Sequence, residues 1–535
     1  MQFFSSSHPH QGGDTLISIL NPVVKGITLT SSVISVGLLF AIAFFVAEKK
    51  GYLQAEALRI RRLALLAMMA WITSIVGSIF VQLALILDTD LLGAFSPNTV
   101  RSFLQQTVIG KTFLAQLFFA LLALALTNRA RKTGAIYWAL GFTVLSIILP
   151  VFQSHSSALG NHSLAIGSLV FHVISISLWV GGVVGLMAIS PQERAISLQR
   201  FSTLALWAAI IVAVSGVINA YTRLNFAGAW NSQYASLVVA KTVMTGLLIA
   251  FGAQHRKYII AKKPHETFSL LGIESVVMIM TIALGAWLST TQPPEHPATT
   301  NLPPHPTLAR LLWSYSPDAV FLGLLILATA LYSRGIILLS RRGDKWPVGR
   351  TIAFACGVAA ADFATSGGIG IYAQYAFSYH MIAHMIIGMI APIGFVLSAP
   401  ITLALRTLPQ GRNHDERGIR GTVISLIHSK AMAFYTNPIV VLAIFDGSLF
   451  LLYMTPLFSG MMHSHSGHLI MNLHFLLSGY LFFHVIIGVD PNPRKVPHIV
   501  RIIMLFAAMS IHAFFSIALL STSTLLDGGY FASIG

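Results

Sequence analysis

The chain has 535 residues, of which 55% are hydrophobic and only 9% are charged, and its mean hydropathy is +0.76. Soluble domains carry about 25% charged residues, so the composition excludes an ordinary soluble domain and predicts a membrane protein. The formal net charge of +16 does not indicate nucleic acid binding, because the 33 Lys and Arg residues lie in short segments between apolar runs. The single cysteine, Cys356, excludes an internal disulfide and a CxxC metal site.

Apolar stretches near 20 residues predict an all-α, polytopic bundle of about fourteen transmembrane helices. In chain order the predicted spans are residues 24–46, 63–87, 110–127, 134–152, 163–189, 201–221, 234–252, 268–289, 316–339, 351–369, 376–398, 436–454, 469–488 and 499–521. The N-terminal segment lacks a basic region and a cleavage site, so we expect the first span to be retained. Residues 400–405 are too short to span and are predicted to lie at the interface.

The distribution of basic residues predicts the orientation of these helices. Of the 33 Lys and Arg residues, 27 fall in every second connection, starting with the first, or in the span ends next to it, and the other six are Lys25, Arg101, Lys111, Arg223, Lys241 and Arg310. Because basic residues are retained on the cytoplasmic side of a membrane, both termini are predicted to be extracytoplasmic.

One connection differs from the rest in composition. Residues 291–312 are rich in Pro and Thr, which is typical of a linker. The predicted organisation is an eight-helix membrane domain over residues 1–292, a Pro-rich outer linker over 293–313 and a six-helix membrane domain over 314–535. Neither half is an obvious repeat of the other, so a fusion of two different modules is expected.

The segment YHMIAHM places His380 and His384 four residues apart, with Met381 and Met385 at the same spacing. Residues at this spacing share one face of a helix, so two imidazoles can converge on one ion. Imidazole and thioether ligands together suit copper, and Cu(I) in particular. A chance HxxxH that packs against polar groups, with Met as core filler, is the alternative interpretation.

A second group of His and Met residues lies in GMMHSHSGHLIMNLH, residues 460–474. Histidine-rich tracts at a surface indicate metal capture. From this segment, His468 and His474 are predicted to reach the depth of His380 and His384, and His512 on the last span is expected to lie in the same outer half. In the first half, His155 falls in an outer loop and His172 within a span, where a hydrogen-bonded core histidine is an equal alternative.

Two parts of the chain resemble known families. The pieces SHSSALGNHSLAIGSLVFHVISISLWVGG, RFSTLALWAAIIVAVSGVINA and SQYASLVVAKTVMTGLLIAFGAQHRK resemble the copper resistance protein D (CopD) family across about residues 130–294. The pieces YHMIAHMIIGMIAPIGFVLSAP, HLIMNLHFLLSGYLFFHVIIGVDPNPRK and MSIHAFFSIAL resemble the CtaG family of cytochrome c oxidase assembly factors across about 315–525. The resemblance implies His155 and His172 as ligands of the first module, and His380, His384, His468, His474 and His512 as ligands of the second.

These observations predict a multi-pass protein of the cell membrane that handles copper, in transport or resistance and in copper delivery for cytochrome c oxidase assembly. No nucleotide-binding or hydrolase motif is present, so an enzyme is not expected. The expected partners are membrane lipid, an oxidase subunit and a separate extracytoplasmic copper donor, with no nucleic acid. Two alternatives stay open: a b-type haem protein for electron transfer, and a proton-coupled transporter that uses Asp362 and Asp446.

Overall fold

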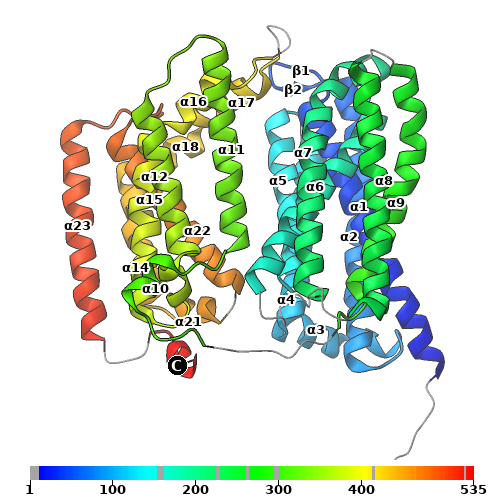
Figure 1. Ribbon diagram of the computed structural model, residues 1–535, viewed down its shortest axis with the longest axis horizontal. Coiled ribbons are helices and arrows are strands. Elements are labelled where there is room, and N and C mark those ends of the chain that lie inside the picture. Colours follow the sequence, from blue (N-terminus) through cyan, green and yellow to red (C-terminus); the bar gives the residue numbers. More distant parts are fainter. Residues whose placement is uncertain are drawn as a thin grey trace, which may run out of the picture. The chain divides into compact units, whose positions relative to one another are not determined.

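The structure is a computed structural model, and it describes residues 11–153, 162–224, 229–260, 264–294, 302–411, 416–463, 465–522 and 526–534. These residues are almost entirely helical, which confirms the predicted fold class. The chain divides into two compact units, unit 1 from Met1 to Thr299 and unit 2 from Thr300 to Gly535. Within each unit the long helices run side by side (Figure 1), as a multi-helix membrane bundle requires.

Unit 1 begins with a long helix and a short hairpin, followed by helices that pack around them. Its elements are α1 (Gln11–Phe44), β1 (Glu48–Lys49), β2 (Tyr52–Leu53), α2 (Ala55–Leu87), η1 (Gly93–Phe95), α3 (Pro97–Gln106), α4 (Val108–Arg129), α5 (Thr133–Ile148), η2 (Leu149–Gln153), α6 (His162–Ala188), α7 (Pro191–Leu224), η4 (Ala229–Asn231), α8 (Gln233–Ile260) and α9 (Pro264–Thr290). β1 and β2 pair antiparallel, with Lys49 opposite Tyr52.

Helix α1 is the centre of unit 1, because it packs against α2, α6 and α9. Its contact with α6 depends on small residues: a Cβ atom added to Gly37 would collide with the backbone of Gly181. Close backbone approach of this kind is how helices gain dispersion energy in lipid, where the hydrophobic effect does not drive them together. The core formed there includes Leu39, Ile42 and Val183.

Unit 2 is built from shorter and more irregular helices. Its elements are α10 (Leu308–Trp313), α11 (Ala319–Arg341), α12 (Val348–Thr365), α13 (Gly368–Tyr372), α14 (Phe377–Met385), the π-helical turn η5 (Ile386–Ile390), α15 (Ala391–Leu397), α16 (Pro400–Thr407), α17 (Gly418–Ile427), α18 (Lys430–Tyr435), α19 (Pro438–Leu442), the π-helical turn η6 (Ala443–Gly447), α20 (Ser448–Tyr453), α21 (Leu457–Met462), α22 (His465–Ile487), α23 (His498–Ser521) and α24 (Tyr530–Ile534).

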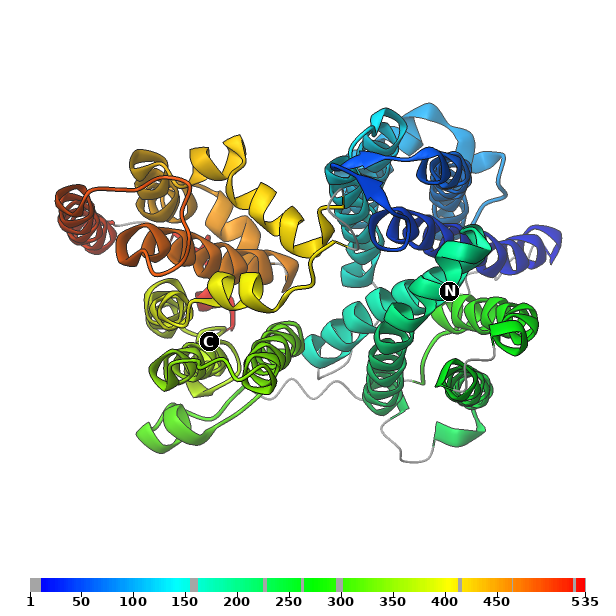
Figure 2. The same ribbon diagram turned by 90° about the horizontal axis from the view of Figure 1, so that it is seen from above.

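The two ends of unit 2 are formed by different short helices, and Figure 2 views its long helices close to end-on. α10, α21, α24 and the start of α14 lie at one end, whereas α16, α17 and α18 lie at the other (Figure 1). The first end is tied together by the Tyr372 hydroxyl, which donates to the Pro304 carbonyl at 2.7 Å. At the second end the Asp490 carboxylate caps α16, accepting from the Ile401 and Thr402 amides at 3.0 and 2.7 Å.

Among the described residues, 13 helices are long and apolar enough to cross a membrane. The predicted span at 436–454 is not one of them, because its apolar helix runs only from Pro438 to Tyr453 and contains η6. At 1.5 Å per residue this segment rises about 24 Å, less than the roughly 30 Å of a bilayer core. Residues 400–405 belong to α16, a separate short helix that follows α15 after a left-handed residue at Ala399, and their interfacial position stays a prediction. The side of the membrane on which the termini lie stays a prediction.

Candidate metal centre

Three histidines from two helices meet inside unit 2. His380 and His384 are one turn apart on α14, and His468 lies in the first turn of α22. One ring nitrogen of each lies within 4.8 Å of the other two. We call these three residues the three-histidine cluster. Helix α22 also packs against η5, which continues α14, and this packing brings the two histidine-bearing segments together.

The cluster is buried and its ring nitrogens face one another. His380 and His384 have 0% and 1% of their surface exposed, and His468 is half-buried. Among the described residues, neither ring nitrogen of His380 has a hydrogen-bond partner, and Nε2 of His384 has none either. Buried polar atoms without partners are rare in native proteins, so they call for a ligand. Three nitrogen ligands about 2 Å from an ion lie about 3.5 Å apart, so small side-chain rotations would complete the site.

Two polar side chains contact the cluster from outside. The Tyr453 hydroxyl on α20 lies 2.6 Å from Nδ1 of His384, and the Asn472 amide lies 3.5 Å from Nδ1 of His468. Both are buried, at 0% and 3% exposure. Because the Nδ1 atoms are engaged, Nε2 is the atom that His384 and His468 can offer to an ion.

Aromatic rings enclose the cluster on several sides. Phe475 lies 4.5 Å from His384 between ring centroids, and Phe458 and Phe531 lie 5.4 and 5.9 Å from His380. Phe531 belongs to α24, so the C-terminal helix packs over this end of the bundle. An ion bound here would sit in an apolar surrounding with uncharged ligands.

The structure places His512 and His474 apart from the cluster. His512 on α23 has its Nδ1 2.7 Å from Oδ1 of Asp446, a carboxylate in the turn η6 that is 1% exposed. His474 is six residues beyond His468 on α22 and packs against the ring of Phe475 at 5.7 Å. Both had been predicted as ligands, and neither belongs to the group of three whose ring nitrogens converge.

Met381 and Met385 lie next to the two histidines in sequence, and the structure places them in the apolar packing around the cluster. Both are half-buried. Each follows its histidine by one residue, which turns it by about 100° around the helix axis. Their role as thioether ligands stays a prediction.

In unit 1 the predicted ligand His172 is buried, with Nδ1 2.9 Å from the Ser215 hydroxyl. Its Nε2 has no hydrogen-bond partner among the described residues. His155 lies outside the described residues. Unit 1 also contains a buried pair in which Nε2 of His255 is 2.7 Å from Oε2 of Glu274.

Asp362, which the proton-coupled transporter alternative would use, accepts a hydrogen bond from the Tyr315 hydroxyl at 3.2 Å. Burial and the neighbouring Asp362 carboxylate raise the pKa of Tyr315, so this hydroxyl keeps its proton and donates. The pair joins the connection between α10 and α11 to the end of α12, and neither residue belongs to the three converging histidines.

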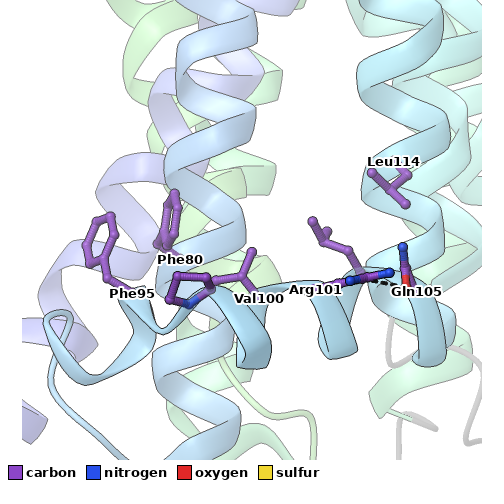
Figure 3. Close-up of a pocket in the computed structure, with 8 residues that line it drawn as sticks. Phe80, Phe95, Val100, Arg101, Gln105 and Leu114 are labelled. Atoms are coloured by element: carbon purple, nitrogen blue, oxygen red, sulfur yellow. Dashed lines mark hydrogen bonds between the residues drawn. The ribbon is translucent and has the colours of Figure 1, made fainter.

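A surface hollow in unit 1 differs from the three-histidine cluster in its chemistry. It lies between the end of α2 and the starts of α3 and α4, and is lined by residues such as Phe80, Phe95 and Leu114 (Figure 3). The residues that line it include no His, Asp, Glu, Cys or Met. The hydrogen bond drawn in Figure 3 runs from the Arg101 guanidinium to the Gln105 side-chain oxygen. It offers no metal ligand.

Comparisons with known proteins cover most of the chain. Residues 16–162 match the family model described as copper resistance protein D-like, N-terminal domain, and residues 195–288 match copper resistance protein D. Residues 330–535 match the cytochrome c oxidase caa3 assembly factor (Caa3_CtaG). The three-histidine cluster lies in this last region.

Among curated proteins, the chain is similar to the uncharacterized protein Mb0105 of Mycobacterium bovis and ML1998 of Mycobacterium leprae. They are 40% and 38% identical to it over 233 residues, which is 44% of this chain and 35% of each relative. The chain thus spans about a third of their length. It is also 24% identical over 220 residues, 38% of this chain and 40% of the relative, to the copper transport protein CutJ of Bacillus subtilis. No solved structure matches the chain significantly.

Proposed function

The chain is a fusion of a copper resistance protein D-like region with a cytochrome c oxidase caa3 assembly factor region, and on this premise we propose that the three-histidine cluster binds copper. The protein is a multi-pass protein of the bacterial cell membrane. In the proposed function it is a carrier without catalytic activity, and copper is its cargo.

The observation that carries this proposal is the convergence of three imidazoles, of which those of His380 and His384 are buried and have ring nitrogens without a hydrogen-bond partner among the described residues. Neutral nitrogen ligands in an apolar cage suit Cu(I), which tolerates low coordination numbers and soft or borderline ligands. Hard cations such as Mg²⁺ and Ca²⁺ require oxygen ligands, and no carboxylate belongs to this group. Cu(I) is therefore the proposed oxidation state.

The matched families support a role for the bound copper in oxidase assembly. An assembly factor of an oxidase whose centres contain copper would pass the ion on, and the similarity to a copper transport protein supports a supply through the same chain. We propose that copper enters from an extracytoplasmic donor and leaves toward an oxidase subunit. Ligand exchange between histidines needs no nucleotide and no covalent step.

The surroundings of the cluster argue against a haem. His380 and His384 lie on one helix with ring centroids 4.1 Å apart, so they cannot be axial ligands on opposite faces of a porphyrin. The rings of Phe458, Phe475 and Tyr453 fill the space beside them. A porphyrin would have to displace several of these rings.

The experiment that tests the proposal is copper analysis of the purified full-length protein, loaded with Cu(I) under reducing conditions. The variants are His380→Ala, His384→Ala and His468→Ala, with His474→Ala as a matched control on α22. We expect the wild type and the control to bind copper and each cluster variant to lose it. Full copper retention in all three cluster variants would remove the site.

A further inference from the structure

The candidate ligand atoms of the three-histidine cluster are closed off from solvent. His380 and His384 are 0% and 1% exposed, and Nε2 of His468 is buried as well. Copper moves from a donor to a protein by exchange of ligands such as imidazole, and the incoming ligand has to reach the ion while the donor still holds it. None of these buried atoms can do so, so the first ligand for incoming copper must lie at the surface.

A line of aromatic rings connects the cluster to the surface at the end of unit 2 where α21 and α24 lie (Figure 1). Phe531 of α24 lies 5.9 Å from His380 between ring centroids, and Tyr530 lies 5.3 Å from Phe531. The Tyr530 ring lies 5.4 Å from the ring of His463, the residue that ends α21. Because His463 is exposed, these contacts lead from solvent to a buried histidine of the cluster.

A hydrogen bond determines which nitrogen of His463 can bind an ion. Its Nδ1 lies 2.7 Å from the carbonyl oxygen of Ser459, one turn earlier in the chain. A carbonyl oxygen can only accept, so Nδ1 is the donor and carries the proton. In the neutral ring Nε2 then has a free lone pair, on a side chain that solvent reaches. His463 therefore presents a ligand atom in the form that copper binds.

Helix α24 is a short segment that covers the cluster. It has five residues and follows a tight turn in which Gly528 and Gly529 have φ angles of +63° and +85°, a conformation that glycine adopts without strain. The Asp527 carboxylate accepts from the Phe531 amide at 2.7 Å and so holds the start of the helix. Short surface segments open at a small fraction of the free energy of global unfolding. Displacement of α24 would uncover His380 while the long helices stay packed.

A contact that caps the end of a helix is the ordinary explanation for His463. His428 shows the same arrangement at the end of α17, where its Nδ1 lies 2.9 Å from the Ile424 carbonyl and its side chain is exposed. The two histidines differ in their place, because α17 lies at the opposite end of unit 2 from α21 (Figure 1). Among the described residues, ring contacts lead to the cluster from His463 and not from His428.

We propose that His463 is the entry ligand for Cu(I), and that Tyr530 and Phe531 form a gate between it and the three-histidine cluster. The inference rests on the proposed function and names the route by which the ion arrives. Nε2 of His463 forms a bond to the ion, and a ligand of the donor leaves with its own electron pair. When α24 moves aside, the His380 imidazole replaces His463 on the ion. The copper stays Cu(I) and Nδ1 of His463 keeps its proton, so no oxidant, reductant or base is needed.

The test follows uptake of Cu(I) by the purified full-length protein from its coloured complex with bicinchoninate, in the absence of oxygen. The loss of colour gives the rate, and the final copper content gives the capacity and shows that each variant is folded. The variants are His463→Ala and Phe531→Ala, and His428→Ala is the matched control. A second readout is the modification of His380 by diethyl pyrocarbonate in the copper-free protein, located by mass spectrometry.

We expect His463→Ala to lower the uptake rate about 10-fold and to reach the same final copper content, while His428→Ala behaves as the wild type. Phe531→Ala should raise both the uptake rate and the modification of His380, because the ring that covers this imidazole is removed. Equal rates in His463→Ala and His428→Ala, or unchanged modification of His380 in Phe531→Ala, would overturn the proposal. Failure of the proposed function would look different, since even the wild type would then contain no copper at equilibrium.

Discussion

Tyr453 determines which nitrogen of His384 faces the centre of the three-histidine cluster. Its hydroxyl lies 2.6 Å from Nδ1 and is fully buried, so this contact has no competition from water. An imidazole that binds a metal through Nε2 must carry its proton on Nδ1, and the phenol oxygen is placed to accept that proton's hydrogen bond. The contact thus holds the ring orientation, and it accommodates the tautomer that metal binding through Nε2 requires.

We predict that Tyr453→Phe lowers the affinity for Cu(I) by about 10- to 100-fold without changing the number of ions bound at saturation. The substitution keeps the ring and removes only the hydroxyl. Competition with a Cu(I) chelator measures the affinity. Tyr480→Phe is the control, because that ring stacks on His484, 6.0 Å away, and no contact joins it to the cluster in the described structure. Equal affinities in the two variants would contradict the role of Tyr453.

Protonation provides a second test at single residues. Copper binding requires all three imidazoles to be neutral at the ligand nitrogen, so protons compete with the ion. Burial in an apolar surrounding disfavours the charged form of the His380 and His384 imidazoles, which are 0% and 1% exposed. We therefore expect the apparent Cu(I) affinity of the wild type to stay nearly constant from about pH 7.5 to 5.5 and to fall only in more acidic solution, while bound copper protects the protein against thermal unfolding. A steep fall of the affinity between about pH 7.5 and 5.5 would indicate exposed histidine ligands and not the buried cluster.

The sequence identifies the pair on α14 because spacing along one helix is visible in the chain. His468 was also predicted, yet nothing in the sequence separated it from His474, since the orientation of α22 about its own axis depends on packing. Asn472 follows His468 by four residues, so its role could have been found by the same spacing rule. Tyr453 could not, because it is distant in sequence and reaches the site through tertiary structure alone.

At the scale of elements, the approach of α22 to η5 sets the distance between the ligands. A Cβ on Gly479 would collide with the carbonyl of Gly388, so these two segments touch through their backbones. We predict that Gly479→Ala separates α22 from α14 and abolishes copper binding although every ligand remains. Gly349→Ala is the control, since a Cβ there meets no neighbour and Ala favours a helix by about 0.5–1 kcal/mol. The copper content of the two purified variants measures the effect. Normal copper content in Gly479→Ala would show that the close approach of α22 to η5 is not needed for copper binding.

The irregular helix of α19, η6 and α20 carries Asp446, and α23 supplies its partner, His512. Replacing His512 by Ala leaves a buried carboxylate without its cation, which costs about 3–5 kcal/mol. We therefore predict a lower unfolding temperature for His512→Ala with unchanged copper stoichiometry. The double variant His512→Ala with Asp446→Asn should recover part of the stability. Loss of copper at unchanged stability would instead make His512 a ligand, as the sequence had suggested.

At the scale of the whole molecule, hydropathy predicted the fold class and nearly all of the spans, because the bilayer imposes length and apolarity on each helix. It could not predict that the segment at 436–454 is short and contains a π-helical turn, since apolar composition there resembles that of a full span. π-helical turns are frequent at functional sites. η5 directly follows α14, which carries His380 and His384, and η6 carries Asp446, the partner of His512.

The orientation of the molecule decides from which side copper reaches the cluster. In unit 2 His380 contacts Phe531 of α24, at the end where α10 and the start of α14 lie. The connection between α11 and α12 lies at the opposite end (Figure 1) and carries Arg342 and Lys345. Because basic connections stay in the cytoplasm, the cluster is expected to face the extracytoplasmic side.

This orientation can be measured because the chain has one cysteine. With Cys356 replaced by Ser, we predict that Ala309→Cys in α10 reacts in intact cells with a thiol reagent that does not cross membranes. Gly349→Cys at the start of α12 should react only after the cells are opened. Both positions are exposed, so accessibility of the side chain is matched. The reverse pattern would place the cluster on the cytoplasmic side, and copper for it would then have to come from a cytoplasmic donor.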